Sequence, residues 1–404
     1  MNKSFLYIEP YVYSVLKNKQ ILLYNTLSGD KIIETIKDKN LLLFLSKLLK
    51  NNKLRIIKFE ENKNSLEIRK FIDKCKQLFM LDVHFGEKPF LIPFETKVMY
   101  DKKYLKSIDS INKISSQINQ INIVLGKSTF CKNEILNSNG IRQFLFPYDC
   151  DKKKDIDAIK LINAISKIKF PLKTINIIGD YFRYSDYKII TEHFSSIFIS
   201  HYAYYLDFEE SFFENNTFEN NNFTFWIDFP CDEININKMI SFLKKKNIDF
   251  SLSFLVTSDK DVSELETLKL INANFNKNII PFYNKHNIDF FKENVFIDDK
   301  DIFEQGVISN KQIFSNMQSN KLFFGKLYFL PDNKIYANPN FVSLGNLEND
   351  WTDILQKNLL NNPCWFKTRK MKPCANCIYQ YLCPPISNYN LVIEKGNLCT
   401  LYHL

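Results

Sequence analysis

The alternation of strand-like and helix-like segments between about Ser107 and Gln305 restricts the fold of this chain more than any other feature. The strand-like segments are INIVLG, KTINIIGD, SSIFISHY, NFTFWIDFP, IDFSLSFLVTS and NIIPFYN. Helical periodicity marks KDIDAIKLINAISKI, YSDYKIITEHF, NINKMISFLKKK and DVSELETLKLINA between them. Apolar strands that alternate with helices form parallel sheets covered on both faces, so the region is predicted to be α/β. About six such units predict a partial (β/α)6 barrel over 107–305, with any chemistry at the C-terminal ends of its strands.

Residues 1–95 predict a smaller α+β unit ahead of this region. SFLYIEP, YVYSVL and QILLYNTL have strand character, and DKNLLLFLSKLLK predicts a helix capped by Asp38. A second helix is predicted where Ile68, Phe71, Ile72 and Cys75 share one face, which makes Cys75 a core residue. This order of strands and helices is typical of a winged-helix-like domain.

Residues 311–404 form a third region with a different pattern. KLFFGKLYFLPDNKIYANPN predicts a hairpin that turns at Pro331-Asp332-Asn333. A helix around DWTDILQKNLL and a turn-rich segment follow, and the last 31 residues contain four of the nine cysteines of the chain.

Those four cysteines have the spacing of a metal site. Two residues separate Cys374 from Cys377, five separate Cys377 from Cys383, and fifteen separate Cys383 from Cys399. Clustered thiolates at short spacing bind zinc or iron–sulfur clusters, and four of them satisfy either a zinc tetrahedron or a 4Fe–4S cluster. The residue types leave both alternatives open.

Charge and hydropathy exclude other classes of function. The net charge is +9, but the lysines are scattered and no basic stripe accompanies the many aromatic residues, so nucleic acid is not an expected partner. The chain has no run of 18 apolar residues and no signal-peptide pattern at its start, which predicts a cytoplasmic protein that does not span a membrane.

A parallel partial barrel followed by a cysteine-rich tail resembles radical SAM peptide-modifying enzymes with a SPASM domain. In that family the tail holds two auxiliary iron–sulfur clusters. Cys374, Cys377, Cys383 and Cys399 match the four ligands of the second cluster. Ligands of the first cluster are missing together: Asn338 or Ala337 stands at the hairpin cysteine, and Ser387 stands at the last position of the Cys-x3-Cys step. The resemblance implies that one cluster is retained and one is lost.

The barrel departs from the same family at its radical SAM site. The family carries Cys-x3-Cys-x2-Cys after the first strand, whereas KSTFCKNEILNSNG follows INIVLG here and contains only Cys131. The Gly-Gly-Glu that ends the second strand in the family is replaced by IIGD, with Gly179 and Asp180. Arg183 follows and could line a vestigial pocket with Asp180. We therefore do not expect SAM as a cofactor or radical SAM catalysis.

A narrower resemblance is to the pseudo-radical-SAM proteins of the GG-Bacteroidales peptide-modification system. It rests on YIEPYV and LLYNTLSG near the start and on CIYQYLCPPISNYNLVIEKGNLC near the end. The resemblance implies a non-catalytic accessory or scaffold protein that works with a true radical SAM maturase on a ribosomally made precursor peptide. The rival interpretations are an active radical SAM-like enzyme with an unusual site and a zinc-stabilised interaction protein.

The winged-helix-like unit fits this implied role, because such domains capture a leader peptide as an added strand at a sheet edge. KQILLYNTL is the candidate edge, with Ile21, Leu22, Leu23 and Tyr24 as the expected peptide-binding residues.

Overall fold

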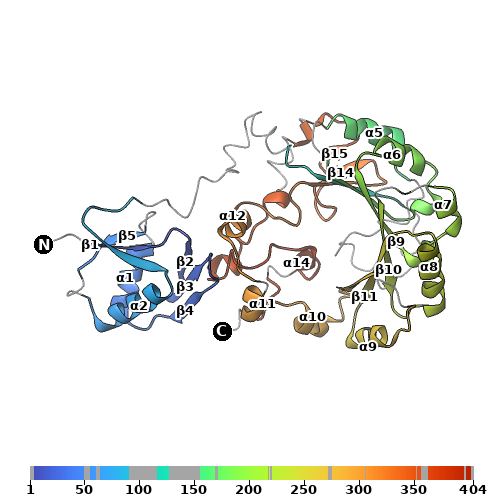
Figure 1. Ribbon diagram of the computed structural model, residues 1–404. Helices are drawn as coiled ribbons and strands as arrows, with labels where there is room; N and C mark the ends of the chain where they lie inside the picture. Colours follow the sequence, from blue (N-terminus) through green and yellow to red (C-terminus); the bar gives the residue numbers. More distant parts are fainter. Residues whose placement is uncertain are drawn as a thin grey trace.

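A computed structural model describes residues 4–49, 55–60, 64–90, 116–126, 155–168, 172–216, 218, 221–271, 275–304, 306–351, 353–355, 363–394 and 397–401. The protein is mixed α/β, with a nine-stranded, mostly parallel sheet and two three-stranded antiparallel sheets (Figure 1). Within these residues, no helix is long and apolar enough to cross a membrane.

The large sheet contains the six strands that the alternating pattern predicts. They are β7 (Gln120–Val124), β8 (Thr174–Ile178), β9 (Phe198–Tyr204), β10 (Asn221–Asp228), β11 (Phe250–Val256) and β12 (Asn276–Pro281). All six are parallel and lie side by side in chain order. The pattern of the sequence therefore predicted both the strands and their direction.

The predicted hairpin also exists, but it extends the same sheet. Its strands are β13 (Lys326–Phe329) and β14 (Lys334–Tyr336), and the short β15 (Gly345–Asn346) pairs with β14. Strand β13 lies parallel to β7, with Leu327 opposite Ile121. The third region of the chain is thus continuous with the second through backbone hydrogen bonds.

Helices cover the outer face of the large sheet (Figure 1). They are α5 (Ala158–Ser166), α6 (Tyr187–His193), α7 (Glu210–Glu214), α8 (Glu233–Lys245) and α9 (Asp259–Thr267). Each of the longer ones begins at a capping side chain. Asp157 caps α5, Asp232 caps α8, and Ser258 forms a capping box with Asp261 on α9.

The inner face of the large sheet contains a row of buried polar side chains. Asn122, Asn176 and Ser200 occupy one row across β7, β8 and β9. The amide of Asn176 donates to Asn122 Oδ1 at 2.7 Å, and the amide of Asn122 donates to the carbonyl of Leu327 at 3.1 Å. Asparagine and serine alternate with isoleucine along these strands, so the polar side chains share one face and the isoleucines share the other.

The N-terminal unit contains the remaining two sheets. Its elements are β1 (Ser4–Ile8), β2 (Val12–Lys17), β3 (Gln20–Asn25), β4 (Lys31–Thr35), α1 (Lys39–Leu49), β5 (Ile56–Lys58), α2 (Leu66–Gln77) and β6 (Leu81–Phe85). The predicted cap of α1 is present, because Asp38 Oδ1 accepts from the Leu41 N–H at 2.7 Å. Cys75 is fully buried among apolar residues, as its helical face predicts. Strands β4 and β6 were not expected from the sequence.

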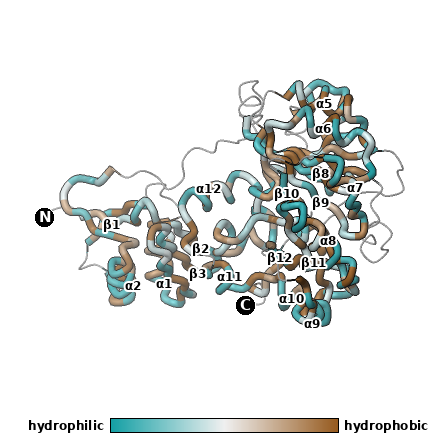
Figure 2. Tube along the Cα trace, turned by 45° about the vertical axis from the view of Figure 1, so that its right-hand side comes forward, coloured by the Kyte–Doolittle hydropathy of each residue, from teal (hydrophilic) through white to brown (hydrophobic). Residues whose placement is uncertain are grey.

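The strand orders of the two small sheets determine which of their strands lie at an edge. One sheet has the order β5-β1-β6, and the other has the order β2-β3-β4. Strand β3 is therefore a central strand. Figure 2 shows hydrophobic residues along the strands of this unit and of the large sheet.

Short helices and turns fill the space between the N-terminal unit and the inner face of the large sheet (Figure 1). They are α10 (Ile288–Asn294), α11 (Asp299–Glu304), α12 (Asn310–Gln318), two 3-10 turns at Pro363–Phe366 and Cys374–Asn376, and α14 (Asn388–Val392). Tyr389 anchors α14 to the end of β12 by donating to the carbonyl of Pro281 at 2.7 Å.

Candidate metal centre

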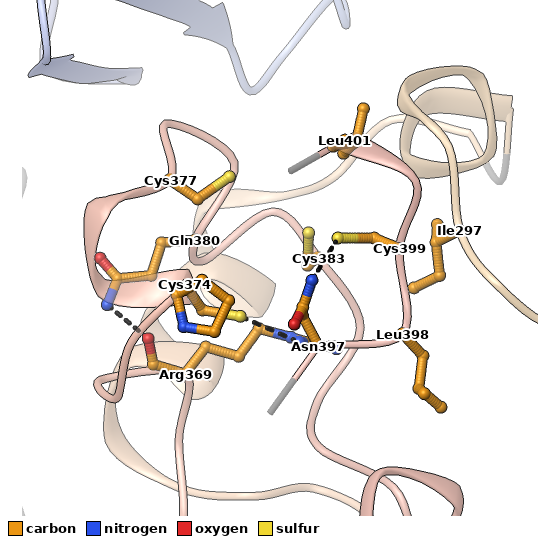
Figure 3. A pocket seen from close by; sticks show the side chains of 11 residues that line it. Ile297, Arg369, Cys374, Cys377, Gln380, Cys383, Asn397, Leu398, Cys399 and Leu401 are labelled. Atoms are coloured by element: carbon orange, nitrogen blue, oxygen red, sulfur yellow. Dashed lines mark hydrogen bonds between the residues drawn. The ribbon is translucent and has the colours of Figure 1, made fainter. Parts of the chain in front are cut away.

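The four cysteines singled out by their spacing surround one pocket (Figure 3). Cys374 and Cys377 lie on a single turn, in which the Cys377 N–H donates to the Cys374 carbonyl at 3.0 Å. Cys383 follows on the same loop. Cys399 arrives from the C-terminal segment, which forms a parallel bridge with Ile297. The fold thus brings together all four predicted ligands, from two separate segments.

Side-chain amides hold the cysteine loop in place. Asn316 on α12 donates to the carbonyl of Tyr381 at 3.0 Å, and Asn320 donates to the carbonyl of Ile386 at 2.7 Å. Within the loop, Gln380 donates to the carbonyl of Arg369 at 2.6 Å. Because the loop has little regular secondary structure, these bonds satisfy backbone acceptors that a helix or sheet would otherwise satisfy.

Two N–H donors point at the sulfurs. Arg369 Nη1 lies 3.4 Å from Cys374 Sγ, and Asn397 Nδ2 lies 3.3 Å from Cys399 Sγ. Arg369 is only 6% exposed. Among the described residues, no carboxylate lies within ion-pair distance of its guanidinium. A buried cation without a carboxylate partner requires negative charge nearby, and the cysteine sulfurs are the groups that can supply it.

Lys17 brings a second cation to the site from the N-terminal unit. Its Nζ donates to the carbonyls of Ala375 and Cys377 at 2.8 and 3.1 Å, and to Gln380 Oε1 at 2.6 Å. Burial lowers the pKa of Lys17, and the nearby Cys377 and Cys374 oppose that shift. Nothing in the spacing of the sequence indicated this residue, because 357 positions separate Lys17 from Cys374 (374 − 17).

Burial and the neighbouring cysteines raise the pKa values of Cys383 and Cys377. Burial raises the pKa of Cys383 to about 12, Arg369 lowers it, and the other three cysteines raise it further. Burial also raises the pKa of Cys377, and Cys374 and Cys399 add to that shift. Four thiolates in this space repel one another unless a cation lies between them. A metal would therefore bind with release of protons.

The donor set fits a metal centre, and its arrangement bears on which one. A zinc tetrahedron with Zn–S bonds of about 2.3 Å places its sulfurs roughly 3.8 Å apart. Within the part of the chain that the structure describes, no three His, Cys, Asp or Glu side chains converge closely enough for a single metal ion. The four cysteines instead surround a space (Figure 3). Cys374, Cys377, Cys383 and Cys399 would be the residues that hold an iron–sulfur cluster there, and N–H···S bonds such as those from Arg369 and Asn397 tune the potential of such clusters.

The positions where the resemblance placed other cluster ligands contain hydrogen-bonded amides. Asn338 is fully buried and donates to Asn388 Oδ1 at 2.9 Å, and Asn340 donates to the same oxygen at 3.2 Å. Ser387 caps α14 through a capping box with Asn390. Asn338 and Ser387 thus form structural hydrogen bonds at the positions where the resemblance placed cysteine ligands.

The end of β8 contains an ion pair. Asp180 is buried and lies 3.2 Å from Arg183 Nη1, and Arg183 Nε donates to Glu209 at 2.7 Å. Burial, followed by the charge of Asp207, raises the pKa of Asp180 to about 6, whereas Arg183 lowers it. Gly179 has a φ of +117°, and a Cβ there would lie 2.7 Å from the Leu125 carbonyl, so this close turn needs glycine. Cys131 lies outside the described residues.

The expectation that KQILLYNTL forms a sheet edge is wrong. Strand β3 pairs with β2 on one side and with β4 on the other, so its backbone groups are already paired. Ile21, Leu22, Leu23 and Tyr24 are each at most 1% exposed. Ile21 and Leu23 pack in the core of the N-terminal unit, whereas Leu22 and Tyr24 pack against the cysteine region. A strand with both faces and both edges covered cannot accept a peptide in this conformation.

Comparison with known proteins adds little to this geometry. No family model matches the sequence, and no curated protein matches it. Among solved structures, native anSMEcpe with bound AdoMet aligns over 69% of this chain and 95% of its own, at 12% identity and a TM-score of 0.40. The structure of native anSMEcpe with bound AdoMet and the Cp18Cys peptide aligns over 69% and 96%, at 12% identity and a TM-score of 0.39. Similarity of this size assigns neither a cofactor nor an activity to the present chain.

Proposed function

We propose that this protein is a non-catalytic accessory protein in the maturation of a ribosomally made peptide, and that it holds one 4Fe–4S cluster. In this proposal it works in the cytoplasm beside a true radical SAM maturase. The N-terminal unit (1–95) is a winged-helix-like peptide-recognition unit, 107–305 is a degenerate partial barrel of radical SAM type, and 311–404 is a SPASM-like domain with one metal site. These assignments follow from the sequence resemblance, and the site geometry supports them.

The observation that carries the proposal is the gathering of four cysteines from two chain segments around one pocket, beside two cations. A 4Fe–4S cluster with four thiolate ligands has a net charge of about −2 in its oxidised state. The positive charges of Arg369 and Lys17 match that charge. Zinc with four thiolates has the same net charge and is the second candidate: four cysteines complete its coordination, but the described side chains do not converge on a single ion in this structure.

The barrel supports a role without radical chemistry. The end of β8 contains the ion pair between the buried Asp180 and the partly exposed Arg183, and in the region 311–404 the Asn338 amide donates to Asn388 Oδ1. Among the described residues, these side chains form an ion pair and a hydrogen bond at positions where the resemblance placed functional residues. We therefore propose that binding, and not turnover, is the function retained by this region.

The peptide edge that we propose in place of β3 is β6. Among the described strands, β6 has a neighbour on one side only, in the order β5-β1-β6. A groove of about 230 Å³ lies beside it, and both β6 and α2 contribute to its lining. The lining combines apolar and charged side chains: Phe59, Ile72, Val83, Phe85, Arg69, Asp73, Lys76 and Asp82. Phe85 is 70% exposed. An edge strand beside a groove of mixed polar and apolar lining offers a peptide both backbone hydrogen bonds and side-chain contacts, which is what binding as an added strand requires.

The metal site is tested by anaerobic purification with iron and zinc both quantified and with absorbance recorded near 400 nm. We expect about four irons per chain. Cys377→Ala should lose the metal, and Cys231→Ala is the matched control, because that half-buried cysteine lies outside the pocket. Stoichiometric zinc without iron would select the zinc-stabilised interaction protein. Full metal in Cys377→Ala would contradict the ligand assignment.

Peptide recognition is tested on the full-length protein with a precursor peptide encoded beside it. Phe85→Lys should weaken binding at least tenfold, because it removes the exposed aromatic side chain that a bound peptide would cover. Leu43→Lys is the control, since Leu43 is 62% exposed on α1 and does not line the groove. Equal affinity of both variants and the wild type would remove β6 as the peptide edge.

A further inference from the structure

The cysteine loop also forms the surface on which the N-terminal unit docks. Ile378 and Leu382 lie between the ligand cysteines on this loop, and they pack with Tyr13, Leu22 and Tyr24 of the N-terminal sheet in one buried cluster. Tyr24 Oη also accepts from the Ile308 N–H at 2.8 Å. A change in the shape of this loop therefore changes the surface that the sheet contacts.

Lys17 joins the two units at the turn that carries the first ligand pair. An ammonium has three N–H donors, and each one has an acceptor here: the Ala375 carbonyl, the Cys377 carbonyl and Gln380 Oε1. Both carbonyls belong to the Cys374–Cys377 turn. The direction in which they point depends on whether the two sulfurs converge on a common centre.

We propose that the metal centre and the docking of the N-terminal unit are thermodynamically coupled through Lys17 and the 374–383 loop. Metal at the four cysteines fixes the turn and so favours the docked sheet, and the docked sheet in turn helps to retain the metal. This inference rests on the proposed metal site. It goes beyond that site, because it makes a distant unit of the chain responsive to metal occupancy.

Two physical effects produce this coupling. The first is geometric, because the ligand loop supplies both the sulfurs and the apolar side chains under the sheet. The second is electrostatic, because a metal centre with a net charge of about −2 attracts the Lys17 ammonium, and release of the sheet removes that cation. Coupling of binding equilibria is reciprocal, so metal binding must favour docking of the sheet and docking must favour retention of the metal to the same extent.

The test compares Lys17→Met, Lys17→Arg and Lys58→Met in the full-length protein after anaerobic metal loading. Methionine keeps the length of the lysine and removes its three donors. Arginine keeps the charge, but its planar fork does not reproduce three bonds from one nitrogen. Lys58 is exposed on β5 in the same unit, so Lys58→Met controls for the lost charge.

The first measurement is the rate of metal loss to a chelator. We expect Lys17→Met to lose metal on the order of tenfold faster than wild type, Lys17→Arg to be intermediate, and Lys58→Met to match wild type. The second measurement is hydrogen exchange of Val12–Asn25 with and without metal. Exchange of this hairpin should accelerate on metal removal, whereas α2 should remain protected, because its buried residues belong to the internal core of the unit and not to the cluster against the cysteine loop.

The outcomes separate this inference from the proposed function. If the wild type binds no metal, the proposed metal site fails and the coupling fails with it. If the wild type binds metal but Lys17→Met releases it at the wild-type rate, and the hairpin exchanges equally in both states, the coupling alone is overturned. Loss of protection in α2 together with the hairpin would indicate general unfolding and would also overturn it.

Discussion

Arg369→Met tests whether the cysteine pocket contains negative charge when the protein is in its functional state. Arg369 is 6% exposed, and its guanidinium lies 3.4 Å from Cys374 Sγ. It also donates to the carbonyl of Pro384 at 2.6 Å. A hydrogen bond to a charged group contributes about 1.5–3 kcal/mol, so its loss should accelerate metal release about 10- to 150-fold.

Arg369→Met should not destabilise the metal-free protein. Without metal, burial keeps the Cys383 thiol protonated, because its pKa is raised to about 12. Without the metal centre, Arg369 keeps the Pro384 carbonyl as a neutral acceptor, but a buried cation without a negatively charged partner destabilises a fold by several kcal/mol. Arg369→Met should therefore leave the stability of the metal-free protein unchanged or increase it.

The assay is urea unfolding of both variants with and without metal, combined with metal release to a chelator. Lys370→Met is the matched control, because it removes the same charge one residue away from an exposed position. If Arg369→Met destabilises the loaded and metal-free proteins by the same amount, Arg369 has a packing role and the charge argument is refuted.

Three further predictions test other parts of the structure. Incubation of the metal-loaded protein with SAM and dithionite should give no 5′-deoxyadenosine above a cluster-free control, and turnover would favour the active-enzyme interpretation. The folded-state pKa of Asp180 is about 6, above its ordinary value of 3.8. The contribution of this carboxyl to the free energy of unfolding is therefore complete below about pH 4 and is lost as the pH rises through 6. Asp180→Asn should remove up to about 3 kcal/mol of that pH dependence of unfolding, and identical profiles would show that the carboxyl titrates normally. Leu22→Ala should cost about 2–4 kcal/mol and should speed exchange in the 374–383 loop as well as in β3, whereas an effect confined to the N-terminal unit would argue against docking through this face.

The sequence by itself determined most of the secondary structure and the identity of the candidate ligands. The six parallel strands follow from local hydrophobic periodicity, and Asp38 and Asp232 start helices because a capping side chain bonds to N–H groups two or three residues away. The spacing from Cys374 to Cys383 is also local, so these thiols could be assigned to one site without coordinates.

Only the tertiary structure decided what surrounds those elements. Strand propensity gives Ile21–Tyr24 as a strand but does not give its neighbours, and pairing with β2 and β4 made it a buried centre where the sequence suggested an edge. The parallel pairing of β13 with β7 and the position of Lys17 at the cysteine turn join residues that are hundreds of positions apart. Such contacts arise from packing between elements, and no periodicity within a short segment records them.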